Sequence, residues 1–185
     1  DFTQVIGSGS IDNFGLIKKS GGTGTSHIHA QIITETDSTI DGNSFQLALY
    51  DVLLRGDSTF TDFPSFNGSI SYEDGAKIFG NVWMNTDWGP TMTGNGSDTL
   101  FIDSTGRLHI AGSGTSTLDN VQLNNAGTIS LAKGTFSSTL SLTNDTVITN
   151  TNNGVIDIQN DFTQVIGSGS IDNFGLIKKS GGTGT

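Results

Sequence analysis

The chain has no cysteine, only two prolines and few cations among its 185 residues. The absence of cysteine excludes disulfides and cysteine-ligated metals. Eight lysines and arginines stand against 18 acidic residues, which gives a formal net charge of −10 without a basic cluster. Because nucleic-acid binding needs cations that neutralise phosphates, we expect no nucleic-acid partner. No apolar run approaches the ~20 residues of a membrane-spanning helix, so we expect no membrane span in this segment.

Strand and turn formers replace the missing helix patterns. Hydrophobic residues make up 33% and charged residues 14%, while 26 residues are glycine and much of the remainder is Ser, Thr, Asn or Asp. Such a composition is typical of many short strands joined by tight turns. No ten-residue run shows a helical period with good helix formers. The sequence therefore predicts an all-β fold.

One 25-residue segment occurs twice. Residues Asp1–Thr25 are identical to Asp161–Thr185, so that the first copy opens the chain and the second closes it. Internal repeats of this kind define the architecture and should be interpreted first. We interpret residues 1–160 as one repeat unit and 161–185 as the start of the next, so that Thr185 leads into another Ser26. The alternative is a terminal segment copied artificially to the other end of the chain.

A shorter period recurs inside this unit. Asn or Asp, then Gly, then alternating apolar residues repeat along the chain, as in Asn125-Ala126-Gly127-Thr128-Ile129-Ser130-Leu131. Asn and Gly adopt the left-handed backbone of tight turns with little strain, and alternation sends every second side chain inward. We expect structural turns at Gly15, Gly42, Gly68, Gly96, Gly127, Gly154 and Gly175, with Asn13, Asn125 and Asn153 preceding three of them.

These glycines follow one another at sequence steps of 27, 26, 28, 31, 27 and 21. A turn-then-strand signal at this period is typical of a solenoid. The sequence thus predicts a right-handed parallel β-helix with about 27 residues per coil and about six coils per 160-residue unit. An antiparallel β-sandwich is the competing architecture.

The Asn-x-Gly-x-Ile-x-Leu repeats, and the segment from Gly15 to Thr25, resemble the β-helical regions of filamentous haemagglutinins and autotransporter passengers. The perfect duplication further resembles giant bacterial surface proteins with tandem units. The resemblance implies an extracellular location at a bacterial cell surface and an adhesive or fibrous role. It is one of repeat style, and it transfers no functional residue.

Residues 60–88 hold seven of the fifteen aromatic side chains. For the phenylalanines we favour the interior of a wider coil. Trp83 and Trp88, set beside Asp87 and with Tyr72 nearby, are candidate contact residues for a glycan or a neighbouring fibre, because tryptophan is enriched at interfaces. Both indoles could equally fill space.

Metal and cofactor signals are weak. His27 and His29 alternate on one strand, but the third histidine, His109, is distant in sequence, so solvated surface histidines are the favoured interpretation. Calcium between turn carboxylates is conceivable, although the Gly-Gly-x-Gly-x-Asp repeat is missing. We therefore expect no cofactor.

Three functions remain, in order of preference. The first is a non-catalytic structural segment of a tandem-repeat extracellular fibre, whose partners are adjacent copies stacked head to tail. The second is a glycan-binding adhesin module that uses Trp83 and Trp88. The third is a polysaccharide-degrading β-helix enzyme, which the lack of a paired carboxylate motif argues against.

Overall fold

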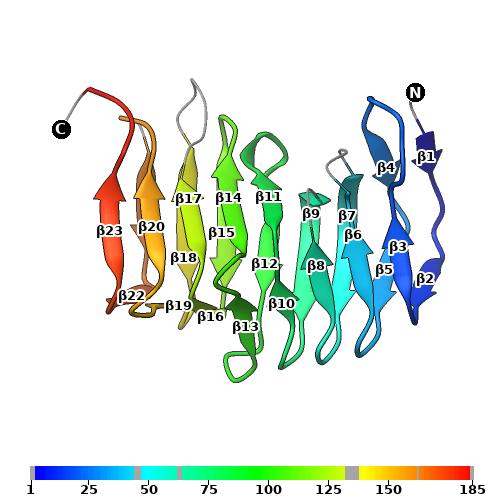
Figure 1. The fold of residues 1–185 in the computed structure, drawn as a ribbon, viewed down its shortest axis with the longest axis horizontal. Coiled ribbons are helices and arrows are strands. Elements are labelled where there is room, and N and C mark those ends of the chain that lie inside the picture. Colours follow the sequence, from blue (N-terminus) through cyan, green and yellow to red (C-terminus); the bar gives the residue numbers. More distant parts are fainter. Residues whose placement is uncertain (1–2, 44–46, 62–63, 132–137, 162, 184–185) are drawn as a thin grey trace.

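The computed structural model describes residues 3–43, 47–61, 64–131, 138–161 and 163–183. In these residues the chain forms a parallel β-solenoid, as predicted, and all strand pairs in the structure are parallel. Its coils stack along the long axis, from the N-terminal β1 at one end to the C-terminal β23 at the other (Figure 1). Each coil contributes strands to three faces.

The first face runs along the whole molecule. Its strands are β1 (Thr3–Val5), β4 (Ser26–Ile28), the beginning of β7 (Leu47–Leu54) and of β9 (Pro64–Tyr72), β11 (Asn81–Asn85), β14 (Arg107–Ala111), β17 (Thr128–Leu131), β20 (Val155–Ile158) and β23 (Leu176–Lys179).

The second face takes the next strand of each coil. It consists of β2 (Ser10–Asn13), β5 (Gln31–Thr34), the ends of β7 and β9, β12 (Thr91–Thr93), β15 (Thr115–Asp119), β18 (Thr139–Thr143) and β21 (Gln164–Gly167). Because β7 and β9 run through both faces, the first two faces form one 15-stranded sheet.

The third face is a separate eight-stranded sheet. It consists of β3 (Leu16–Lys18), β6 (Thr39–Asp41), β8 (Thr59–Thr61), β10 (Lys77–Ile78), β13 (Thr99–Ile102), β16 (Gln122–Asn125), β19 (Val147–Asn150) and β22 (Ser170–Asn173). One short 3₁₀ turn, η1 (Thr86–Trp88), lies at the corner between β11 and β12.

Alternation in the strands builds the core. In β15 the side chains of Ser116 and Leu118 are buried while those of Thr115, Thr117 and Asp119 face outward. Inward residues of successive coils stack directly on one another, as in the row Ile32, Val52, Ile70, Met92, Leu118 and Leu142. Burial of each such side chain contributes roughly 1.5–3 kcal/mol.

The coils are shorter than predicted. Successive coils are about 23 residues apart, and the chain makes about seven turns. The predicted period was too long because the glycine marks lie at different corners. Gly15 lies between β2 and β3, whereas Gly127 lies between β16 and β17, and Gly68 lies inside β9. The stretch from Gly15 to Gly175 therefore spans seven coils and one further strand.

The coils that carry the phenylalanines are also narrower, not wider, than their neighbours. The step from Thr59 in β8 to its register partner Lys77 in β10 is the shortest along the third face, because β9 passes from the first to the second face without a loop. Phe60 and Phe66 are buried there as predicted, with ring centroids 4.6 Å apart at 67°. Phe63 lies outside the described residues.

The two identical segments occupy different faces. Residues Ser10–Asn13 form β2 on the second face, whereas their copy Ser170–Asn173 forms β22 on the third. Likewise Leu16–Lys18 pair with β6 on the third face, whereas their copy, Leu176–Lys178 of β23, pairs with β20 on the first. The same sequence can thus form strands on different faces of the coil, because every face needs only alternating apolar residues and a turn at Asn-x-Gly.

Candidate functional site

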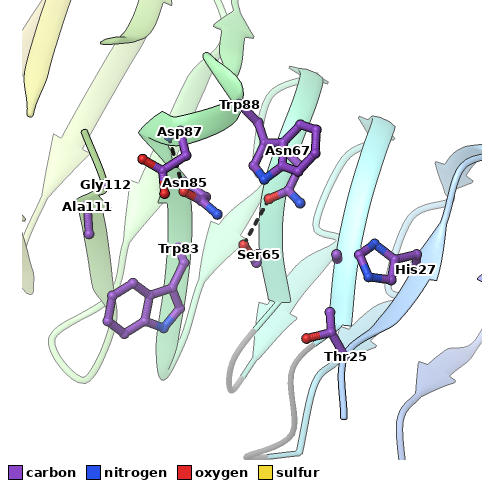
Figure 2. A pocket seen from close by; sticks show the side chains of 11 residues that line it. Thr25, His27, Ser65, Asn67, Trp83, Asn85, Asp87, Trp88, Ala111 and Gly112 are labelled. Carbon is purple, nitrogen blue, oxygen red and sulfur yellow. Dashed lines mark hydrogen bonds between the residues drawn. The ribbon is translucent and has the colours of Figure 1, made fainter. Parts of the chain in front are cut away.

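The first face carries a groove between two aromatic side chains. Trp83, Ser65, Ala48 and His27 lie in register on four adjacent strands, β11, β9, β7 and β4. The two middle side chains are small, so a hollow of about 470 Å³ opens between the indole of Trp83 and the imidazole of His27 (Figure 2). At ~4.8 Å per strand, the two rings are about 14 Å apart along the solenoid.

Trp88 overhangs this groove from η1. Asn85 caps the turn by accepting a hydrogen bond from Asp87 N at 3.2 Å, and Gly89 ends it in the left-handed conformation, φ 60°. Pro90 follows and cannot extend the turn. The local sequence Asn-Thr-Asp-Trp-Gly-Pro therefore specifies a tight corner that projects the indole of Trp88 outward, where it is 61% exposed.

Ser113, in the next coil, holds the η1 turn in place. Ser113 donates to Asp87 Oδ1 from both its backbone N and its Oγ, each at 2.6 Å. These two bonds hold the pKa of Asp87 below its usual range, so the side chain is a carboxylate at neutral pH. A side chain at Gly112 would collide with Thr86, because an added Cβ would lie 2.4 Å from Thr86 Oγ1.

Tyr50 connects the groove's polar groups on the opposite side. Its hydroxyl lies 2.9 Å from His27 Nδ1 and accepts a 3.4 Å hydrogen bond from Asn67 Nδ2. The ring stacks on His29, with centroids 4.0 Å apart, and meets Trp88 edge-on at 6.4 Å and 78°. His27 and His29 are thus members of an aromatic cluster rather than isolated surface side chains.

The histidine at the edge of the groove carries little positive charge. Burial, together with the neighbouring His29, lowers the pKa of His27 below its ordinary value of 6.5. On the far side, His109 stacks on Trp83, with centroids 4.3 Å apart at 21°, and its Nε2 lies 3.1 Å from Asn81 Oδ1. Asn81 thus holds the His109 ring, and the stacked His109 ring fixes the plane of the Trp83 indole.

Three of the four predicted contact residues come together. Trp83, Trp88 and Asp87 all line the groove. Tyr72 does not, since it is 4% exposed and its hydroxyl accepts a hydrogen bond from Gln122 N at 2.9 Å. Sequence reasoning missed His27, Ala48 and Ser65 as groove residues because their proximity to Trp83 follows only from the strand register.

The predicted turn residues have varied roles. Gly15, Gly42, Gly127, Gly154 and Gly175 lie between strands, whereas Gly68 lies within β9, opposite an irregularity of β7. Asn13 and Asn125 end strands, and each accepts a hydrogen bond from the glycine two residues on. Asn153 is exposed in a turn. In that coil it is Asn150 that stacks on Asn125.

The two ends of the solenoid form a second kind of candidate surface. Val165 and Ile177 continue core rows whose preceding members, Leu140 and Ile156, are 2% and 3% exposed. At the last coil these two side chains are 40% and 45% exposed. Among the described strands, β21, β22 and β23 each have a neighbour on one side only, as do β1, β2 and β3.

In comparisons with known proteins, no family model, no curated protein and no solved structure matches this chain. In the part of the chain that the structure describes, no three His, Cys, Asp or Glu side chains gather as a metal site would require. The described residues also include no helix with the length and hydropathy of a membrane span.

Proposed function

We propose that this chain is a non-catalytic structural segment of an extracellular β-solenoid fibre on a bacterial cell surface, in which like copies stack end to end. The observation that carries this proposal is that core rows and strand edges are open at the first and last described coils. At one end Val5 continues the core row of Ile28, and at the other Val165 and Ile177 continue the core rows of Leu140 and Ile156.

A second copy of this chain is the partner that such an end fits. Unpaired parallel strands offer backbone N–H and C=O groups to another strand, and a coil of the same fold supplies both the hydrogen bonds and the apolar cover. The contact joins one end to the opposite end, so it does not close on itself and leads to filaments. The extracellular location rests on the resemblance in repeat style to bacterial surface proteins.

The test is concentration-dependent assembly of the purified chain, followed by sedimentation velocity and negative-stain electron microscopy. Filaments should show an axial repeat of roughly 40 Å, or a small multiple, because each chain contributes eight or nine strands to each face at ~4.8 Å each. Discrete particles at all concentrations would overturn the proposal.

A matched pair of variants locates the contact. Ile177→Lys places a charge in the exposed core row and should abolish assembly. Leu176→Lys places the same charge one residue away, in register with the outward-facing Val155, and should assemble like the parent chain. Equal assembly of the two variants would count against end stacking.

The groove favours a second function, that of an adhesive module that binds saccharides. Exposed tryptophan beside amide and carboxylate groups, in a hollow of this size, is the arrangement that small polar ligands with apolar faces require. The two functions are compatible, because the groove strands β4, β7, β9 and β11 lie between β1 and β14 on the first face and not at an end (Figure 1).

A further inference from the structure

The shape of the groove limits the size of its ligand. Ala48 and Ser65 form a floor two strands wide, and Trp83 and His27 bound it on either side. The hollow of about 470 Å³ is at the lower end of the range for small-molecule sites, roughly 300–1,000 Å³. One or two sugar rings fit this volume, whereas a folded protein segment does not.

The walls favour a ligand with a flat C–H face. The indole of Trp83 is held against His109, and that of Trp88 is held by the capped turn η1 and by the edge of Tyr50. Rings held in place before binding lose little entropy when a ligand packs on them. A pyranose presents such a C–H face on one side of its ring, while its hydroxyls point toward the rim.

The rim matches hydroxyl groups, which both donate and accept. Asn85 Oδ1 is bonded to Asp87 N, and Figure 2 shows its amide nitrogen turned toward the centre of the groove. Asn67, Thr25 and Asp87 contribute further amide, hydroxyl and carboxylate groups to the lining. The rim can therefore serve several sugar hydroxyls at once.

The charge of the groove lining favours neutral over acidic sugars as ligands. Among the described residues that line the groove there is no lysine and no arginine, and Asp87 is held as a carboxylate. His27 adds less positive charge than an ordinary histidine, since burial and the neighbouring His29 lower its pKa. A uronate, sialate or sulfate group would meet repulsion without a compensating cation, in a chain of net charge −10.

We infer that the groove binds one or two neutral pyranose residues of a surface or secreted polysaccharide, stacked between Trp83 and Trp88. This inference rests on the adhesive function proposed above and names its ligand class. The acidic polysaccharides of mucus and capsules are excluded as ligands of this site.

The experiment measures retention of the purified chain on immobilised oligosaccharides, in two sets. The neutral set contains cello-, manno-, galacto- and laminari-oligosaccharides, and the acidic set contains oligogalacturonate, hyaluronan and sialyllactose. We expect millimolar to micromolar binding to at least one neutral sugar and none to the acidic set. Trp83→Ala and Trp88→Ala should each weaken binding tenfold or more.

Two controls accompany these variants. Phe101→Ala removes an exposed aromatic ring on the third face and should leave binding unchanged. Asp87→Asn keeps the side-chain shape and removes the charge. It should reduce the difference in binding affinity between the neutral and the acidic sugars. Each variant is checked by circular dichroism and melting temperature, so that loss of fold is separated from loss of binding.

The outcomes test the neutral-sugar ligand class and the adhesive function separately. Tryptophan-dependent binding of an acidic sugar in preference to every neutral one would overturn the ligand class and leave the adhesive function standing. Binding that survives both Trp variants would overturn the groove as the site. Absence of binding to both sets at millimolar concentration would overturn the inference and the adhesive function together, while fibre assembly is judged separately by sedimentation.

Discussion

Asn125 donates a 2.7 Å hydrogen bond from Nδ2 to Oδ1 of Asn150, one coil further on, and Asn150 repeats the bond, also at 2.7 Å, to Asn173. Asn125 and Asn150 are fully buried at the corner between the third and first faces. Asn125 Oδ1 also accepts from Gly127 N at 3.1 Å. This ladder satisfies polar groups in the interior and fixes the corner in successive coils.

Replacement of the middle member should therefore be costly. Asn150→Ala removes the 2.7 Å acceptor of the buried Asn125 amide, which keeps only its longer bond to Val155 O, and an unsatisfied buried N–H costs roughly 1–3 kcal/mol. We expect a clear drop in the urea midpoint. The matched control is Asn153→Ala, three residues away and exposed, which should stay within ~0.5 kcal/mol of the parent. Equal midpoints for the two variants would contradict a ladder role for Asn150.

Gly68 occupies a close backbone contact that Gly15 lacks. A Cβ added at Gly68 would lie 2.0 Å from the carbonyl oxygen of Tyr50, which belongs to the backbone and cannot move aside. Gly68→Ala should destabilise the fold by roughly 1–3 kcal/mol. At Gly15 an added Cβ meets nothing within 4 Å, so Gly15→Ala should be neutral or slightly stabilising. Thermal unfolding of the two variants provides the comparison, and a neutral Gly68→Ala would count against the contact.

Tyr72 couples coils rather than binding a ligand. Its hydroxyl bonds to the backbone N and O of Gln122, at 2.9 and 3.3 Å, in a later coil of the chain. Burial raises the pKa of Tyr72 to about 12, so folding favours the neutral phenol. The stabilisation is complete below the unfolded-state pKa near 10 and is lost as pH rises from 10 to about 12. Tyr72→Phe should unfold more easily at pH 8, and its pH profile between 10 and 12 should be flatter. Parallel profiles for parent and variant would exclude this coupling.

Asp87 provides a second pH test at the groove. Ser113 lowers the pKa of Asp87 through two hydrogen bonds that favour the carboxylate. The bonds therefore contribute above the ordinary pKa of 3.8 and are lost only as pH falls through the lowered value. In a Trp83→Phe background, Trp88 is the single tryptophan, and its emission should change with a midpoint below pH 3.8. Ser113→Ala removes one donor and should move that midpoint upward. An unmoved midpoint would show that the hydroxyl has no part in the shift.

The fold was largely predictable from sequence, and the geometry of the site was not. Alternation in segments such as Thr128-Ile129-Ser130-Leu131 predicted a parallel solenoid, because alternation and Asn-Gly turns act locally. The predicted coil was too long, because the same turn motif serves at two different corners. Trp83, Asp87 and Trp88 stood out by composition alone. Their partners His27 and Ser65 depend on register between strands of different coils, which no local pattern specifies.

Lysines in the two identical segments give a direct test of their different faces. Lys19 is buried, and its Nζ donates to the carbonyls of Gly21 and Gly24 at 3.1 and 2.7 Å. Its copy Lys179 is exposed and bonds to the side chain of Asp161. Lysine acylation at low reagent concentration should therefore modify Lys179 several-fold faster than Lys19, because a buried amine must first break these contacts.

An internal control comes from the adjacent pair, Lys18 and Lys178. Both are similarly exposed, at 38% and 45%, and each lies near an aspartate, Asp41 or Asp157. These two lysines should react at similar rates. Digestion before aspartate yields peptides of different length from the two segments, so mass spectrometry can follow each lysine separately. Equal rates at Lys19 and Lys179 would mean that the two lysines share one environment. They would contradict the placement of the two identical segments on different faces of the solenoid.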